Sequence, residues 1–194
     1  PPNRLPPVMP KFIQHGVCEG EGQRIRNRAE AEALAEVIQS LVTDDAYEGK
    51  SMGVIALQGH AQAELIENLL AQRLDPKTIE ERRLRCGEPA SFQGDQRDVM
   101  FLSLVIAPKV HYRALNRLPD QRRFIVAMSR ARDQVWLLHS VQQHDGRDDA
   151  GVGAEGALHK AQLVEGGDDE PDWAEREEKE ADDEEAGNLD LGQR

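Results

Sequence analysis

The segment from Arg122 to Ser140 contains the residues best suited to chemistry in this chain. Its sequence, RRFIVAMSRARDQVWLLHS, places four arginines around an apolar stretch, at Arg122, Arg123, Arg130 and Arg132. A single arginine on an amphipathic helix is usually a solvated charge above a buried stem. Cations at both ends of a short helix, in contrast, are placed to bind a multiply charged anion.

The same segment predicts a helix followed by a strand. No Pro or Gly interrupts residues 122–139, and apolar residues recur at three- and four-residue steps, so we expect a helix over Arg122–Arg132. Helical spacing would place Arg123, Val126 and Arg130 on one side. Asp133 and Gln134 would then turn the chain into a strand over residues 135–138.

The arginine segment resembles the sixth motif of superfamily 1 nucleic-acid helicases, in the group that includes the helicase of nonsense-mediated mRNA decay and its bacterial relatives. The resemblance rests on the pattern R-R-x-x-V-A-x-[ST]-R-A-R. In that family the first arginine of the last four residues reaches across a cleft to the ATP γ-phosphate. The resemblance therefore implies a catalytic role for Arg130, a nucleotide-binding role for Arg123 and a supporting role for Arg132. Ile125 departs from the family, in which many members have Asn there.

A second segment, SFQGDQRDVMFLS from position 91, resembles the fifth motif of the same family, S-F-Q-G-x-E-x-D followed by an apolar strand. Gly94 would permit close approach of a nucleic-acid backbone, and Ser91 and Gln93 can donate hydrogen bonds to phosphate. The resemblance implies that these residues and Phe92 face nucleic acid. It also implies nucleotide binding by Gln96, although the family usually has Glu here, and Gln lacks its charge.

A third segment, GVIALQGHAQ from position 53, resembles the fourth motif, which implies a nucleic-acid role for Gln62. The Thr-Pro-Tyr part of that motif is absent. The nearby sequence Gly49-Lys50-Ser51 copies the end of a phosphate-binding P-loop, but Asp44 occupies the position of its first glycine. A P-loop also follows a strand and begins a helix, whereas this one precedes an apolar strand. The chain therefore carries no Walker A motif.

The elements that would position these motifs alternate between strand and helix. Asn27 and Glu30 have the spacing of a helix N-terminal capping box. The expected elements, in chain order, are a strand over residues 12–17, a loop over 18–26, helices over 27–43, 59–74 and 76–83, and strands over 52–57 and 99–107, with a brief strand before Gly87. This alternation predicts a three-layer α/β sandwich with a mainly parallel sheet. The resemblance implies the RecA-like form of that sandwich, as in P-loop NTPases.

Two features were open to more than one interpretation. Arg82, Arg83 and Arg85 could form a basic rim for nucleic acid or an ordinary solvated surface. The loop 108–119 contains Tyr112, Arg113 and Arg117, which could stack on a base or bind phosphate, although surface loops also carry such residues without a function.

Charge divides the chain into regions. Residues 1–141 contain 19 Lys and Arg against 18 Asp and Glu, whereas residues 142–194 contain 5 against 18. We expect residues 1–26 to be an extended lead-in with a first strand, residues 27–141 to be the helicase lobe, and residues 142–194 to be a disordered acidic tail. Because the acidity belongs to the tail, it does not argue against a nucleic-acid partner for the rest of the chain.

The remaining composition indicates a cytoplasmic protein. Cys18 and Cys86 have neither a C-x-x-C partner nor matching His spacing, so we expect reduced thiols and no metal site. No apolar run has membrane-spanning length, and no signal peptide is recognisable. The start at Pro-Pro without Met suggests a fragment, a processed product or an incomplete reading frame.

Taken together, the motifs imply the second motor lobe of an ATP-dependent superfamily 1 helicase. This lobe would supply an arginine finger and part of the surface for single-stranded DNA or RNA. ATP and Mg²⁺ would be held mainly by a separate Walker A/B lobe, so the chain alone would not hydrolyse ATP. The alternatives are a non-catalytic nucleic-acid or protein-binding module derived from such a lobe, or a truncated gene product.

Overall fold

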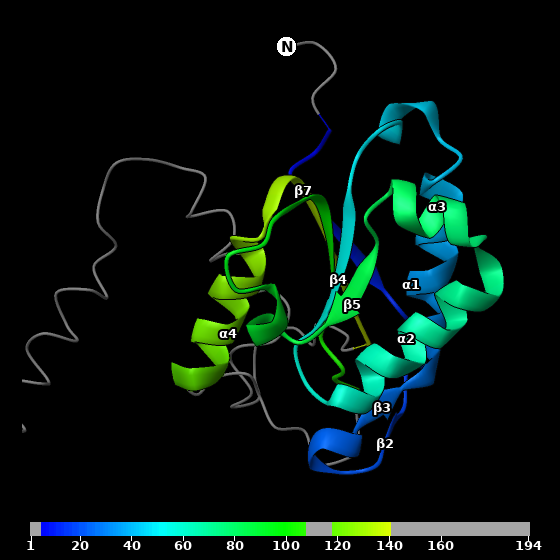
Figure 1. The fold of residues 1–194 in the computed structure, drawn as a ribbon. Coiled ribbons are helices and arrows are strands. Elements are labelled where there is room, and N and C mark those ends of the chain that lie inside the picture. Colours follow the sequence, from blue (N-terminus) through cyan, green and yellow to red (C-terminus); the bar gives the residue numbers. More distant parts are fainter. Residues whose placement is uncertain (1–4, 108–117, 141–194) are drawn as a thin grey trace, which may run out of the picture. The chain divides into compact units, whose positions relative to one another are not determined.

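A five-stranded sheet forms the centre of the computed structural model, which describes residues 5–107 and 118–140 (Figure 1). The strands lie in the order β1-β7-β6-β4-β5, and every neighbouring pair is parallel. Their bounds are β1 (Val8–Phe12), β4 (Met52–Ala56), β5 (Arg85–Gly87), β6 (Arg97–Ser103) and β7 (Ala131–His139). Parallel neighbours require crossover connections, which in this fold contain helices.

Helices cover both faces of the sheet. Three of them, α1 (Arg28–Leu41), α2 (His60–Arg73) and α3 (Pro76–Glu81), lie on one face, and α4 (Leu118–Met128) lies on the other (Figure 1). The predicted three-layer α/β sandwich with a mainly parallel sheet is therefore confirmed. None of the helices in the described part of the chain has the length and hydropathy needed to cross a bilayer.

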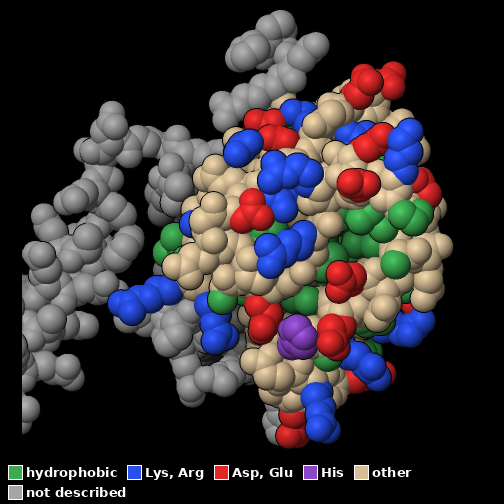
Figure 2. Space-filling view, in the orientation of Figure 1, with side chains coloured by type: hydrophobic (Ala, Val, Ile, Leu, Met, Phe, Trp, Pro, Cys, Tyr) green, Lys and Arg blue, Asp and Glu red, His purple; other side chains and the backbone are tan. Residues whose placement is uncertain are grey.

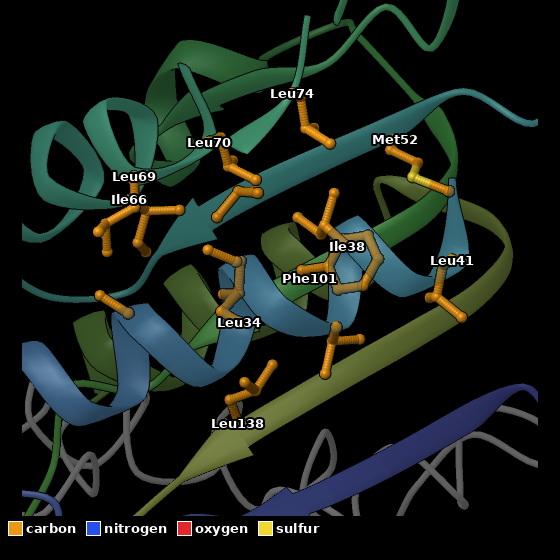
Figure 3. Close-up of a cluster of buried hydrophobic side chains, with 14 of the residues drawn as sticks. Leu34, Ile38, Leu41, Met52, Ile66, Leu69, Leu70, Leu74, Phe101 and Leu138 are labelled. Atoms are coloured by element: carbon orange, nitrogen blue, oxygen red, sulfur yellow. The ribbon is translucent and has the colours of Figure 1, made fainter. Parts of the chain in front are cut away.

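The larger part of the core lies between the sheet and the helices α1 and α2. Figure 3 shows the buried side chains of α1 and α2 pointing toward those of the strands, among them Leu34, Ile38, Leu70 and Phe101. All five residues of β4 are buried, which explains its continuous apolar sequence. A second cluster, which includes Phe92, Phe124 and Leu137, lies on the α4 face.

The predicted capping box of α1 forms only in part, because the Asn27 backbone N–H donates to Gln62 Oε1 rather than to the Glu30 side chain. The Asn27 side chain accepts a hydrogen bond from the Glu30 backbone N–H at 3.2 Å. The residues predicted to face the core from this helix are all buried: Ala31, Leu34, Val37, Ile38 and Leu41. The predicted inward side of α2 is also confirmed, and it consists of Ala63, Ile66, Leu69 and Leu70.

The predicted start of the chain is wrong in two places. The first strand is Val8–Phe12 rather than residues 12–17, and it includes Pro10. Proline is tolerated there because β1 is an edge strand and needs ladder hydrogen bonds on one side only. The predicted loop over residues 18–26 contains a 3-10 turn and a small antiparallel pair, β2 (Cys18–Glu19) with β3 (Arg26–Asn27).

The boundaries around the arginine segment also differ from those predicted. The helix ends at Met128 rather than Arg132, Ser129 and Arg130 form a turn, and the strand begins at Ala131. Pairing with β6 explains the early end, because Ala131 is in register with Arg97. At its other end β6 stops at Ser103 rather than residue 107, and Val105 has a left-handed φ of 55°.

Two predictions fall on residues outside the described ranges. These are most of the loop 108–119, with its tyrosine and two arginines, and the acidic tail 142–194.

Candidate nucleotide and nucleic-acid site

The two arginine-containing motifs meet where β6 and β7 begin. The backbone N–H of Arg97 donates a hydrogen bond to the carbonyl oxygen of Arg130 at 3.0 Å. The side chains on either side of this bond are also linked, because Arg132 Nε donates to Gln96 Oε1 at 3.4 Å. Sheet pairing therefore brings the fifth-motif and sixth-motif segments together, although more than thirty residues separate them along the chain.

Arg130 lies in the turn between α4 and β7, and the end of its own helix orients its guanidinium. Nε donates to the Val126 carbonyl oxygen at 3.1 Å and approaches Ser129 Oγ at 3.3 Å. Nη2 donates to the same hydroxyl at 3.0 Å. Among the described residues no carboxylate forms an ion pair with Arg130.

Arg123 lies on the exposed side of α4, as does Arg122. It precedes Val126 by three residues, and Val126 in turn accepts the hydrogen bond from Arg130. Arg123 and Val126 therefore share a helix side as predicted, whereas Arg130 lies beyond the last helical residue.

The side chains of Gln96 and Arg132 contact each other. Gln96 is exposed, and its contact with Arg132 is long for a hydrogen bond. Arg132 Nη1 also lies 3.8 Å from Asp98 Oδ1. Burial opposes ionisation of Asp98, but hydrogen bonds from Ser51 and the nearby charges of Arg132 and Lys50 outweigh it and lower the pKa of Asp98. Arg132 thus connects Gln96 to the start of β6.

Lys50 and Ser51, which resemble the end of a P-loop in sequence, make contacts within the fold. Lys50 Nζ lies 2.6 Å from Asp133 Oδ2, and Ser51 bonds Asp98 through both its backbone N–H and its hydroxyl. These contacts tie the start of β4 to the starts of β6 and β7.

The loop of the fifth motif is exposed around a buried centre. Ser91, Gln93 and Gly94 are exposed, and a Cβ added to Gly94 would meet no atom within 4 Å. Gly94 has a φ of +77°, which glycine adopts without strain. Ser91 Oγ donates to the Glu88 carbonyl oxygen at 2.7 Å. Phe92, the remaining predicted contact residue, is fully buried beneath this surface.

Gln62 is also fully buried, and it acts within the fold. Its Oε1 accepts from the Asn27 backbone N–H at 2.8 Å, and its Nε2 donates to the Asn27 carbonyl oxygen and to Ser103 Oγ. Ser103 ends β6, whereas Arg97 begins it beside Arg130. A seven-residue strand spans about 20 Å, so Gln62 and Arg130 lie at opposite ends of the strand.

Sequence reasoning missed a cluster centred on Asp95. A hydrogen bond from Arg97 Nη1 to Asp95 Oδ1 is the main cause of the lowered pKa of Asp95. Arg83 and Arg85 also approach this carboxylate, each at 3.9 Å. The sequence pattern that could have indicated this cluster is the group of arginines at the start of β5, Arg82, Arg83 and Arg85. Its first member, Arg82, is structural and donates to two backbone carbonyls.

Comparison with known proteins identifies the family of this chain. Residues 10–142 match the AAA domain family, which covers more than half of the chain. The chain belongs to this family. It is also 31% identical over 145 residues to an uncharacterized ATP-dependent helicase of Mycoplasma genitalium, an alignment that covers 69% of this chain and 13% of that helicase.

The match to the AAA domain family agrees with the parallel sheet and its flanking helices. The arrangement is a RecA-like α/β fold, and the two matches support a superfamily 1 helicase-like domain. ATP use and nucleic-acid binding are properties that such a family suggests. The chain spans 13% of the length of the helicase that it matches.

Proposed function

We propose that this domain is the second motor lobe of an ATP-dependent superfamily 1 helicase and that Arg130 is its arginine finger. The proposal is carried by the contacts of the Arg130 guanidinium, which has hydrogen-bond acceptors but no carboxylate partner among the described residues. Hydrogen bonds to Val126 and Ser129 orient it, and among the described residues no carboxylate neutralises it. Phosphoryl transfer requires such a cation near the charge that develops on the γ-phosphate.

In this proposal the other nucleotide contacts come from the same end of the sheet. Arg123 on the exposed side of α4 and Gln96 beside Arg132 help to hold the nucleotide. A Walker A/B lobe holds most of the phosphates together with Mg²⁺. Closure of the two lobes on ATP would then bring Arg130 to the γ-phosphate.

The nucleic-acid surface is proposed on the exposed part of the fifth-motif loop. Ser91 and Gln93 offer polar groups to phosphate, and Gly94 leaves room for a backbone to approach. Phe92 and Gln62 are buried, so their proposed contributions are indirect. Phe92 supports the loop from below, and Gln62 fixes the start of α1 against the end of β6.

In a complete helicase that contains this lobe, Arg130→Ala is expected to lower kcat for ATP by about 10³-fold or more while the nucleotide still binds. Arg28→Ala is the matched control, because Arg28 is an exposed arginine at the start of α1 and lies outside the arginine motif. Steady-state phosphate release and nucleotide binding would be measured on both variants. Near-normal turnover in Arg130→Ala would refute the assignment.

A second candidate function is a binding module that lacks coupling to ATP. Gln96 favours it, because a neutral amide stands where the family usually has a carboxylate, and its contact with Arg132 is long. Binding of a single strand that is the same with and without ATP in the complete helicase would favour this candidate over the motor lobe.

A further inference from the structure

Two exposed arginines at the edge of the sheet form a cationic surface beside the fifth-motif loop. Arg83 precedes β5 and Arg85 begins it, and their side chains are 60% and 49% exposed. We refer to Arg83 and Arg85 as the edge arginines. Figure 2 shows Lys and Arg side chains near the centre of one face of the domain, with acidic side chains between them.

The charge of the edge arginines is incompletely neutralised. Their shared carboxylate, Asp95, is already hydrogen-bonded to Arg97, whose side chain is only 5% exposed. The edge arginines approach Asp95 at 3.9 Å, which is longer than a charge-assisted hydrogen bond of about 2.7–2.9 Å. Three guanidinium groups around one carboxylate leave a surplus of two positive charges, and the exposed members are the edge arginines.

The acidic residue that follows β5, Glu88, does not pair with the edge arginines. Glu88 precedes the 3-10 helix η3 (Pro89–Phe92), and its carboxylate lies 3.8 Å from His60 Nδ1. Within the described part of the chain, Glu88 forms no ion pair with either edge arginine.

The buried ring of Phe92 holds this surface in place. The guanidinium carbons of Arg85 and Arg97 lie 5.4 and 5.8 Å from the ring centroid, within the range of cation–π contacts. A side chain that is already restrained loses less conformational entropy when it binds a ligand. Phe92 therefore has a second role besides supporting the loop, because it orients Arg85.

The edge arginines and the loop also form one continuous structural unit. Gly87 of β5 packs so closely on Ser91 that an added Cβ would lie 2.1 Å from Ser91 Oγ. Asp95 follows Gly94 directly and contacts both edge arginines. The exposed Ser91, Gln93 and Gly94 are thus fixed next to the two cations.

We propose that Arg83 and Arg85 bind two phosphates of a single-stranded nucleic acid and extend its path from the 91–94 loop to the β5 edge of the sheet. The inference rests on the proposed function, because it takes the nucleic-acid partner from it. Exposed guanidinium groups bind phosphates without regard to base sequence. The edge arginines therefore contribute affinity and position rather than sequence preference.

The test is the salt dependence of binding to a fluorescent single-stranded oligonucleotide, measured by anisotropy on the full chain. Each lost phosphate contact should reduce the slope of log affinity against log salt by about 0.7. We expect the double variant Arg83→Ala, Arg85→Ala to lose about 1.4 from the slope. Arg83→Lys with Arg85→Lys keeps both charges and should retain nearly all of it.

A matched control removes the same charge elsewhere. Arg26 and Arg28 are also exposed, and each pairs with a single carboxylate, so Arg26→Ala with Arg28→Ala should leave the slope unchanged. If the edge-arginine variant keeps the wild-type slope, or if both double variants lose the same amount, the inference fails while the proposed nucleic-acid role stands. If the wild-type chain binds no single strand at all, both are overturned. Thermal unfolding would verify that all variants are folded.

Discussion

At the scale of single residues, the environment of each arginine separates the proposed binding groups from those held by contacts within the fold. Arg82 and Arg97 are committed to backbone carbonyls and, for Arg97, to Asp95. Arg130 instead takes acceptors from its own helix end and keeps its charge unpaired among the described residues. An arginine whose acceptors are neutral can still stabilise a developing negative charge, which is why Arg130 is the proposed finger.

The most unusual single residue is Glu30, a fully buried carboxyl. Its Oε1 accepts from Ser103 Oγ at 2.6 Å and from the Val105 backbone N–H at 3.1 Å, and its Oε2 accepts from Asn27 Nδ2. No cation contacts it among the described residues, and the other titratable group that faces it is the Cys18 thiol. Burial raises the pKa of Glu30 to about 7, although these hydrogen bonds oppose the shift.

This raised pKa predicts a pH dependence of stability. The pKa of Glu30 is higher in the folded than in the unfolded chain, so its stabilising contribution is complete below about pH 4.5 and is lost as pH rises through about 7. Relative to Glu30→Gln, the wild type should lose on the order of 3 kcal/mol of unfolding free energy across this window. Urea unfolding near the two ends of the window would measure it.

The control for this prediction is Glu32→Gln, which removes an exposed carboxylate from the same helix. Its stability should follow that of the wild type at every pH. Parallel stability curves for the wild type and Glu30→Gln would show that Glu30 does not titrate in this range.

At the scale of elements, the fifth-motif loop combines a rigid underside with an open surface. Phe92 is packed in the α4-side cluster, whereas Gly94 extends into open space in a left-handed conformation. The loop can therefore present polar groups without losing its anchor in the core.

Replacement of Gly94 by Ala tests this arrangement. The left-handed conformation should cost about 1–2 kcal/mol of stability, and the added methyl group should weaken single-strand binding because it occupies the surface that the backbone approaches. Unfolding free energy and oligonucleotide anisotropy would be measured together.

Gly22 provides the comparison, because it also has a positive φ and no atom near an added Cβ. Gly22→Ala should lose similar stability without a change in binding. Equal loss of binding in both variants would argue against a specific role of the 91–94 loop.

At the scale of the whole molecule, one RecA-like domain supplies only part of a phosphoryl-transfer site. We expect the 194-residue chain to release no phosphate from ATP above background, even with saturating single strand and Mg²⁺, because it lacks a Walker A motif. A phosphate-release assay would measure this, with the intact helicase as positive control. Turnover by the chain alone, abolished in Arg130→Ala, would contradict the two-lobe proposal.

The sequence by itself determined the motifs and most of the elements, although not all of their bounds. The continuous apolar run of β4, the helical periodicity of α1 and α2, and the Asn27–Glu30 spacing are patterns among residues a few positions apart. Such local patterns predicted the three-layer sandwich and the family resemblance that the comparisons support.

Only the tertiary structure decided which side chains remain available to ligands. Phe92 and Gln62 belong to motifs that resemble nucleic-acid contacts, yet both are buried, and Gln62 bonds Asn27, which lies 35 residues away. Pro10 fits a strand because that strand is at an edge, and the arginine helix ends early because Ala131 pairs with Arg97. Burial and hydrogen-bond partners depend on residues distant in the chain, and no local spacing encodes them.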